Sequence, residues 1–488
     1  MKNLLITLTI LLFTNLQILF AQFPIDGQYQ SIHPTTTPLM PAYSGIVSDT
    51  SVPSTINIKR ISQLYTPWNW YPDIEYAKIQ TWNADGSLYK FRTGLVKDAT
   101  THTIVKQLPS GDLYPSYWSN TNTDLIYGFR ENGDIKTYTV SDSTLQIVFS
   151  LQGYDIVKLG PGEGNIDKND KYVALVGKKG LDLDVIVFDL QQNVIIHTET
   201  IVGAWGSSAS IPKYIDWVSV SQSGDYLGIM WDHNQTSISN PFNTHYGVEI
   251  YNTTNVAFLR RIARYGNHGD FGYDANGEEV FVQFWGPNTS EHINMYYLDR
   301  IERIPLTTNF DFEAAGHISC RNINRPGWAY VTINDSSQSG QIVAMKLDTS
   351  GLVEHFGHHY SSNRVPLAVA SPDGKKVMFR SDFGTNLSSG EVYVFESTIS
   401  EIVGIDESQN DHLIAYPNPA KNRLKIEFNR TINDIYVFNN IGQKTLSLPG
   451  VNSLSKEINI EHLAKGLYFI IITTNTGEYY SKQFKKIE

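Results

Sequence analysis

Histidine, cysteine and arginine gather in three short segments of this 488-residue chain. The segments cover residues 260–270, 316–321 and 355–359. They interrupt a repeat of turns and strands, and we expect successive repeats to bring these interruptions toward a common centre. Imidazole, thiol and guanidinium groups that meet at one place can bind a metal or an anion and can transfer protons.

One interpretation of these groups is a zinc site, most simply a structural one. Imidazole nitrogens and a thiolate suit tetrahedral zinc, and His317 precedes the single cysteine of the chain, Cys320, in an H-x-x-C spacing. The predicted ligands are His268, His317, Cys320 and His358, with His355 and His359 as alternatives to the last. The alternative remains open that the histidines are ordinary hydrogen-bonded residues and that the cysteine is a small buried hydrophobe.

A second interpretation is a site that holds an anion and moves a proton. Guanidinium groups hold carboxylate or sulfate through paired hydrogen bonds, and a tyrosine hydroxyl can transfer a proton. We predict Tyr246 and Arg264 as catalytic residues, and Arg261, Arg321 and Arg325 as substrate-binding residues. The alternative, which we weight equally for the arginines, is that they form ion pairs with the excess carboxylates of the chain.

Two carboxylates offer a further possibility. Glu163 with Asp216 or Asp270 could form the acid pair of a glycoside hydrolase, but the sequence does not give the distance between them. The chain contains no glycine-rich phosphate loop, no Gly-x-Ser-x-Gly elbow and no His-Glu-x-x-His helix. Nucleotide, serine-esterase and zincin chemistry therefore have no support.

A repeat of about 40 to 50 residues predicts the elements that position these groups. Each unit has a polar turn, often Asp-Gly, that leads into an apolar strand and then a second strand. Glycine in this turn supplies a positive φ. The seven units begin at residues 83–86, 131–134, 167–173, 221–226, 274–280, 325–330 and 371–377. We predict an all-β chain with a seven-bladed β-propeller over residues 22–400, with a pair of β-sandwiches as the alternative.

Two resemblances extend this prediction. Residues 371–379, Ser-Pro-Asp-Gly-Lys-Lys-Val-Met-Phe, resemble the hairpin of periplasmic WD40-like propeller repeats. Arg264 four residues before His268, ahead of the His317 and Cys320 pair, loosely resembles the propeller polysaccharide lyases of the ulvan-lyase type. That resemblance implies β-elimination next to a uronate carboxylate, with a tyrosine or histidine as base, an arginine on the carboxylate and a bracing zinc.

The chain departs from the lyase pattern in its first half. The lyases carry catalytic histidines in earlier blades, whereas residues 34–232 of this sequence contain only His102 and His197. Both histidines lie in segments that read as ordinary strands or loops. The lyase activity is accordingly one alternative among three.

The last eighty or so residues indicate where the protein goes. A Pro-Asn-Pro turn at residues 417–419 precedes a segment in which Leu424, Ile426 and Phe428 alternate with charged residues, which predicts a strand with one wet face. Together with residues 437–443 and 463–470, these motifs resemble the C-terminal sorting domain of type IX secretion cargo from a Bacteroidetes-type cell. We predict a linker at residues 401–412 and a small β-sandwich sorting domain at residues 413–488, with the type IX secretion machinery as a partner.

The N-terminus and the composition complete the prediction. Residues 1–21 have the basic start, apolar run and closing alanine of a secretory signal peptide, and no second apolar stretch long enough to span a membrane follows. A formal net charge of −11 argues against general binding to nucleic acid. We predict a secreted or cell-surface propeller that binds or processes a polysaccharide. The alternatives are a polysaccharide lyase that acts on a uronate-containing polymer and a non-catalytic cell-surface interaction scaffold.

Overall fold

The computed structural model describes most of the chain in two compact units. The described residues are 38–49, 56–63, 73–109, 111–231, 244–284, 293–307, 316–333, 340–362, 365–385, 391–397, 413–439, 444–475 and 479–487. The predicted signal peptide at residues 1–21 and the predicted linker at residues 401–412 lie outside them. One unit is Phe23–Ser397, and the other contains Thr398–Glu488.

The described residues of the first unit form seven small antiparallel sheets. In strand order, one sheet is β1 (Ile46–Asp49), β2 (Ile56–Arg60), β28 (Glu391–Ser397), β27 (Val377–Ser381) and β26 (Val369–Ala370). The next three are β3 (Leu88–Lys90), β4 (Leu95–Asp98), β5 (Ile104–Gln107); β6 (Ser116–Trp118), β7 (Leu125–Phe129), β8 (Asp134–Thr139), β9 (Thr144–Ser150); and β10 (Ile156–Leu159), β11 (Tyr172–Lys179), β12 (Asp182–Asp189), β13 (Val194–Ile201). The last three are β14 (Ile215–Val220), β15 (Tyr226–Trp231), β16 (Gly247–Asn252), β17 (Phe258–Ala263); β18 (Gly269–Tyr273), β19 (Glu279–Phe284), β20 (Ile293–Tyr297), β21 (Arg303–Pro305); and β22 (His317–Ser319), β23 (Trp328–Thr332), β24 (Gln341–Lys346), β25 (Val353–His358).

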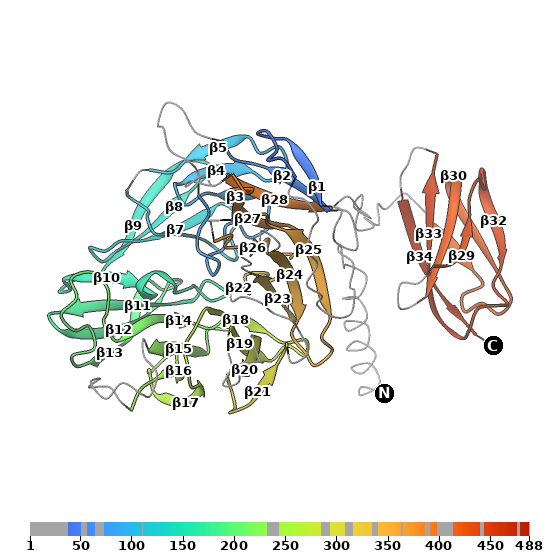
Figure 1. Ribbon diagram of the computed structural model, residues 1–488. Coiled ribbons are helices and arrows are strands. Elements are labelled where there is room, and N and C mark those ends of the chain that lie inside the picture. The colour runs from blue at the N-terminus through green and yellow to red at the C-terminus, as the bar shows by residue number, and fades with distance from the viewer. Residues whose placement is uncertain are drawn as a thin grey trace. The chain divides into compact units, whose positions relative to one another are not determined.

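The sheets stand around a common centre, with β14, β18, β22 and β26 nearest to it and β17, β21 and β25 at the periphery (Figure 1). The ring closes where β2 from the start of the unit pairs with β28 from its end. The prediction of an all-β, propeller-like domain is confirmed. In the described part of the chain only a short 3-10 segment, η2 (Gly160–Gly162), is helical.

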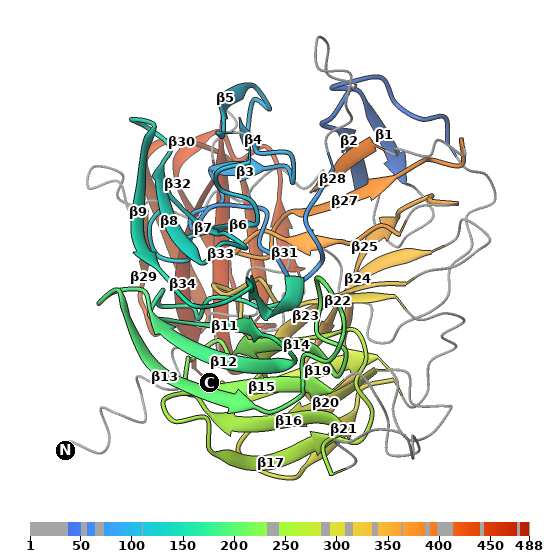
Figure 2. The same cartoon turned by 90° about the vertical axis from the view of Figure 1, so that its left-hand side faces the viewer.

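The core lies between neighbouring sheets. One cluster packs Val185 of β12 against Val218 of β14 and Leu227 of β15, and Trp205 fills the space between them. Because side chains alternate across a strand, the middle strands bury both faces against the sheets on either side. Each sheet therefore needs its neighbours, and Figure 2 shows the consecutive sheets stacked in this way.

Five of the seven predicted turns join a strand near the centre to the next strand of its sheet, as in the hairpin at Gly374 between β26 and β27, and the turn at residues 83–86 directly precedes β3. The turn at residues 131–134 differs, because it joins the second and third strands of its sheet, β7 and β8. The predicted positive φ of the turn glycine is confirmed, with +92° at Gly133 and +71° at Gly374. A Cβ at Gly374 would lie 2.3 Å from the hydroxyl oxygen of Tyr330, so a side chain is excluded there by contact as well.

The second unit is a six-stranded antiparallel sheet with its own core. Its strands are β29 (Ile414–Tyr416), β30 (Arg423–Asn439), β31 (Lys444–Leu448), β32 (Ser453–Asn459), β33 (Gly466–Thr474) and β34 (Tyr479–Lys486). The long strand β30 pairs with β29, β31, β32 and β33. The predicted alternation in β30 is confirmed, since Leu424, Ile426 and Phe428 are buried between exposed or half-buried charged residues.

Among the described residues, no helix has the length and apolar character needed to cross a membrane.

Candidate functional site

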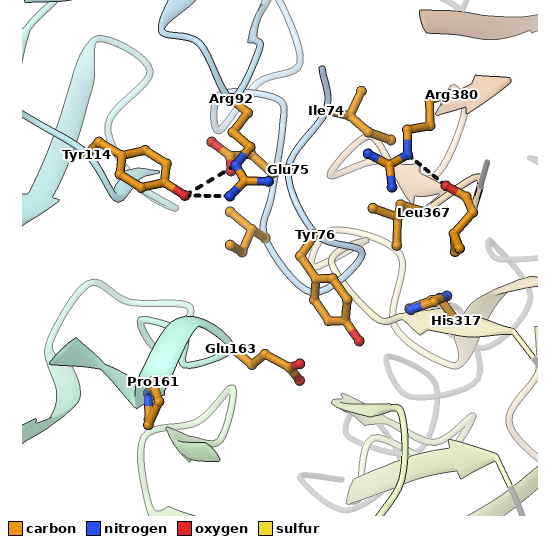
Figure 3. A pocket seen from close by; sticks show the side chains of 12 residues that line it. Ile74, Glu75, Tyr76, Arg92, Tyr114, Pro161, Glu163, His317, Leu367 and Arg380 are labelled. Carbon is orange, nitrogen blue, oxygen red and sulfur yellow. Dashed lines mark hydrogen bonds between the residues drawn. The ribbon is translucent and has the colours of Figure 1, made fainter. Parts of the chain in front are cut away.

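A pocket of about 460 Å³ lies where segments from several sheets meet (Figure 3). Residues 74–79, which precede β3, form one wall, and Glu163, which follows η2, forms another. His317 at the start of β22 and Arg380 on β27 also line the pocket, with Arg92, Tyr114 and the apolar residues Pro161, Val365 and Leu367. The pocket thus collects ionisable side chains from parts of the chain that are far apart in sequence.

Tyr76 and two histidines form the chemical centre of this pocket. The Tyr76 hydroxyl oxygen lies 2.7 Å from Nδ1 of His268. The ring centroids of His268 and His317 are 4.5 Å apart, and the Tyr76 ring meets His317 edge to face at 5.2 Å. His268 directly precedes β18 and His317 begins β22, so the two inner strands of adjacent sheets hold the imidazoles side by side.

Burial sets the protonation states of this centre. Partial desolvation lowers the pKa of His268, which keeps an exposed edge, and burial together with the neighbouring His268 lowers the pKa of His317 to about 3. Burial and the negative charges of Glu163 and Asp216 raise the pKa of Tyr76 well above its usual value. At neutral pH both imidazoles are therefore neutral proton acceptors, and the Tyr76 hydroxyl is a proton donor.

Buried lysines neutralise the two glutamates of the pocket. Nζ of Lys78 lies 2.7 Å from Oε2 of Glu163, and Nζ of Lys90 lies 2.5 Å from Oε1 of Glu75. Burial alone would raise the pKa of Glu163, but the ion pair with Lys78 outweighs it and lowers that pKa. Both glutamates are thus paired with a lysine, so they do not repel an anion as free carboxylates would.

Two arginines line the pocket. Nη1 of Arg380 binds both carboxylate oxygens of Asp73, at 2.7 and 2.9 Å, and Arg92 donates to the Tyr114 hydroxyl oxygen at 2.8 and 3.2 Å. The lining contains two guanidinium groups, Arg92 and Arg380, and two carboxylates, Glu75 and Glu163, each of which is paired with a lysine. On a chain with a net charge of −11, this is a local site suited to an anion.

The predicted residues Tyr246, Arg261 and Arg264 also lie together, but away from the centre. They line a second pocket beside β17, the outermost strand of its sheet. The expectation that residues 260–264 approach the centre is therefore wrong. The inner strand β18 begins only at Gly269, so the chain crosses from periphery to centre within this segment. Only its end, at His268, contacts a residue of the central pocket, Tyr76.

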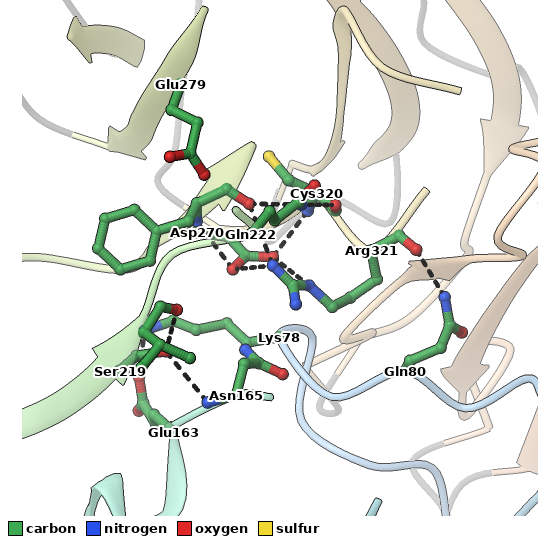
Figure 4. A network of polar contacts seen from close by, with 12 residues as sticks. Lys78, Gln80, Glu163, Asn165, Ser219, Gln222, Asp270, Glu279, Cys320 and Arg321 are labelled. Atoms are coloured by element: carbon green, nitrogen blue, oxygen red, sulfur yellow. Dashed lines mark hydrogen bonds and ion pairs between the residues drawn. The ribbon is translucent and has the colours of Figure 1, made fainter. Parts of the chain in front are cut away.

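Arg321 and Arg325 form internal ion pairs, as the alternative interpretation stated. Arg321 holds the buried carboxylate of Asp270 through two hydrogen bonds of 2.9 and 2.8 Å (Figure 4). Arg325 donates to Oε1 of Glu354 at 2.6 Å and to the Tyr330 hydroxyl at 2.8 Å. Asp270 is accordingly committed to Arg321 and is not a free partner for Glu163 in an acid pair.

The four predicted zinc ligands do not converge. His317 and Cys320 are three residues apart in extended chain, so their side chains point to opposite faces, and Cys320 packs with Ile318 in a hydrophobic core. His358 lies on the peripheral strand β25, where its Nδ1 is 2.8 Å from Oδ2 of Asp49. Only His268 and His317 meet, and the described residues hold no group of three or more possible ligands. We derive no chemistry through a metal ion.

The sequence interpretation missed Tyr76, Arg92 and Arg380. A signal was present in residues 73–80, Asp-Ile-Glu-Tyr-Ala-Lys-Ile-Gln, because three charged residues in an otherwise largely apolar segment indicate paired buried charges. Lys78 and Glu75 are indeed buried. Their partners come from other sheets or from later in the chain, which the segment itself does not reveal.

The depressed pKa of His317 predicts a pH dependence of stability. The unfolded chain takes up a proton near pH 6.5, whereas folded His317 stays neutral down to about pH 3. The unfolded state therefore binds more protons in this window, and stability falls as the pH drops from 7 toward 3. We expect His317→Gln to reduce the slope of the unfolding free energy against pH there by up to about 1.4 kcal/mol per pH unit.

Urea unfolding at several pH values between 7 and 4 measures this slope. His197→Gln, at a half-buried position on the outer strand β13, is the matched control and is expected to leave the slope closer to that of the parent chain. Equal slopes for the parent chain and His317→Gln would contradict the assignment of a neutral, buried His317.

Comparisons with known proteins identify the C-terminal unit and the fold of the first. Residues 414–486 match the family described as the secretion system C-terminal sorting domain. No curated protein matches the chain. A solved oligogalacturonate lyase in complex with manganese has a TM-score of 0.52 and 12% identity, over 73% of this chain and 97% of its own. An oligogalacturonate lyase from Vibrio parahaemolyticus has a TM-score of 0.49 and 11% identity, over 72% of this chain and 96% of its own.

The first of these likenesses supports the propeller-like fold of residues 23–397, and the family match supports the predicted nature of the tail. The tail thus accounts for the destination of the protein. The chain ends in a type IX secretion C-terminal sorting domain, which marks it as cargo of that system, exported to the cell surface or the extracellular space.

Proposed function

We propose that the central pocket binds the end of an anionic, uronate-containing oligosaccharide. One observation carries the proposal: Arg92 and Arg380 share a pocket of about 460 Å³ with the hydroxyl of Tyr76 and a neutral histidine. Guanidinium groups hold carboxylates through paired, charge-assisted hydrogen bonds, and hydroxyl and imidazole groups suit sugar hydroxyls. The solved neighbour is an oligogalacturonate lyase by name, but its likeness concerns the fold, and the proposal depends on the charges of this pocket.

Arg380 is the group that would bind the carboxylate. Its Nη1 faces Asp73 and its Nε donates to the carbonyl oxygen of Val365 at 2.8 Å, so the guanidinium is held in place before any ligand arrives. A ligand carboxylate would lie beside Asp73, whose charge Arg380 already offsets. Fixed donors lose little conformational entropy on binding, which favours affinity.

We expect Arg380→Ala to weaken binding of trigalacturonate by about ten-fold to a hundred-fold, because a hydrogen bond to a charged group contributes about 1.5 to 3 kcal/mol. Isothermal titration calorimetry on the full chain measures the effect, with neutral maltotriose as the ligand control. Arg300→Ala is the variant control, since Arg300 lies outside the pocket among Glu278, Asp299 and Glu302. Unchanged affinity in Arg380→Ala, or an equal loss in Arg300→Ala, would contradict the proposal.

A second candidate function, cleavage by β-elimination, is favoured by the placement of Tyr76 and His317, whose rings meet edge to face at 5.2 Å in the pocket. In this reaction the neutral imidazole of His317 accepts the proton on the carbon next to the uronate carboxylate. The electron pair left on that carbon forms a double bond to the adjacent carbon, and the bond from that carbon to the glycosidic oxygen breaks. The Tyr76 hydroxyl donates its proton to the departing oxygen, and water then returns the proton from His317 to Tyr76.

A further inference from the structure

We propose that the outer rim of the propeller carries a second site, which binds an anionic polysaccharide chain. The site, called here the outer groove, is a pocket of about 560 Å³ lined by Tyr246, Phe258, Arg260, Arg261, Arg264 and Ile301 among others. It lies along β17, at the periphery of its sheet, whereas the central pocket is lined from other sheets (Figure 1). The inference goes beyond the proposed function and does not depend on it.

The charge of the outer groove selects an anion. Three arginines line the groove, and no carboxylate is among its described lining residues. Arg264 is exposed, and its guanidinium makes no hydrogen bond or ion pair with the described residues and lies 5.6 Å from the centroid of the Tyr265 ring. On a chain with a net charge of −11, an accessible guanidinium of this kind is available to a ligand rather than to the protein's own carboxylates.

Arg261 forms a part of the groove lining that is held in place by hydrogen bonds. Its Nη2 lies 2.5 Å from Oε1 of the buried Glu249, and its Nε donates to the carbonyl oxygen of Tyr246 at 3.0 Å. The Tyr246 ring stacks against this guanidinium, with 3.5 Å between Cζ and the ring centroid. Glu249 also accepts hydrogen bonds from Trp231 and Tyr251, which hold the carboxylate in place. The stacked pair is therefore organised before a ligand binds.

Exposed rings around the arginines suit a sugar polymer. The side chain of Phe258 is 53% exposed and that of Tyr265 is 37% exposed, and Ile301 at the edge of the groove is 82% exposed. Aromatic faces offer apolar contact to the ring faces of sugars, while the arginines hold carboxylate or sulfate groups. A small inorganic anion would use the guanidinium groups but not the rings.

The geometry of β17 disfavours a peptide strand as the occupant. The pairing of β16 with β17 shifts register twice, between Val248 and Glu249 and between Ile250 and Tyr251. Such irregularities and charged side chains on an edge strand oppose the addition of another strand. A ligand of the outer groove would therefore contact side chains rather than the backbone of β17, which favours a polysaccharide over an extended peptide.

Affinity electrophoresis of the full chain in gels that contain polygalacturonate, dextran sulfate or neutral dextran tests this inference. We expect Arg264→Ala to raise the dissociation constant for the anionic polymers about ten-fold, since one charge-assisted contact is lost and the fold is not involved. If Arg264→Ala loses retardation only in gels with polygalacturonate, the site binds carboxylates. If it loses retardation only with dextran sulfate, the site binds sulfates. Neutral dextran is expected to leave the mobility of the parent chain and of Arg264→Ala unchanged.

Two variants separate the outer groove from the central pocket and from general charge effects. Arg300→Ala removes the same charge from a position outside the groove lining and is expected to bind as the parent chain does. Arg380→Ala is expected to keep polymer retardation, even where it loses trigalacturonate. The inference is overturned if Arg264→Ala is retarded like the parent chain, or if Arg300→Ala loses as much.

Discussion

Tyr76→Phe is expected to lower the rate of oligouronate cleavage by about 10² to 10⁴-fold, the usual contribution of one positioned proton-transfer group. Without the hydroxyl, the departing oxygen loses the proton donor that lies 2.7 Å from Nδ1 of His268. The substrate carboxylate is still held by Arg380, so we expect the dissociation constant for trigalacturonate to change only a few-fold. A large loss of turnover without a matching loss of affinity distinguishes a proton donor from a residue that only shapes the pocket.

The ultraviolet absorbance of new unsaturated ends measures this rate with pectate, alginate and ulvan as substrates. Tyr226→Phe on β15 is the matched control, because this tyrosine lines neither pocket. A turnover in Tyr76→Phe equal to that of the control would refute the assignment of Tyr76. A parent chain that forms no unsaturated product from any of the three polymers would refute cleavage and leave the binding proposal to be judged by calorimetry.

Arg321→Met is expected to lower the free energy of unfolding by about 3 to 5 kcal/mol, the usual result of removing one partner of a buried ion pair. Asp270 is fully buried and receives two hydrogen bonds from Arg321 and one of 2.8 Å from the backbone N–H of Cys320. Burial raises the pKa of Asp270 although Arg321 opposes the shift. Without the guanidinium, the carboxyl would be left charged without compensation or would take up a proton.

The loss of stability is expected to extend to several sheets, because the backbone carbonyl groups next to this ion pair accept hydrogen bonds from other parts of the chain. Nε2 of Gln80 donates to the carbonyl oxygen of Arg321 at 2.7 Å, and Nε2 of Gln222 donates to that of Cys320 at 2.7 Å (Figure 4). Urea unfolding measures the loss, with Arg300→Met as the exposed control, expected within about 0.5 kcal/mol of the parent chain. The pair Asp270→Asn with Arg321→Met is expected to recover part of the loss. Equal stabilities of Arg321→Met and Arg300→Met would disprove the role of this ion pair.

Local sequence patterns predicted much of the fold. Turns with glycine at positive φ, such as those at Gly133 and Gly374, depend on only a few residues, so they can be recognised without a partner. The alternation of Leu424, Ile426 and Phe428 likewise follows from the two-residue period of a strand with one buried face. The sorting domain was recognisable because three of its motifs lie in order within one short segment.

The candidate site was predicted only in part. His268 and His317 were expected to meet, and they do, because each belongs to the start of an inner strand in adjacent sheets. The spacing of His317 and Cys320 suggested shared metal ligation, but a strand turns residues three apart to opposite faces. Tyr246 and Arg264 were expected at the centre, but they lie beside a peripheral strand.

The sequence by itself determined the destination of this protein, its all-β character and the turns that separate its strands. Those features depend on residues that are close together in the chain. Only the tertiary structure decided which strand of each sheet faces the centre, and hence that Tyr76, His317 and Arg380 share one pocket while Arg264 lies on the rim. The reason is physical: inner and outer strands have similar local patterns, and their places are set by packing between sheets and by ring closure through β2 and β28.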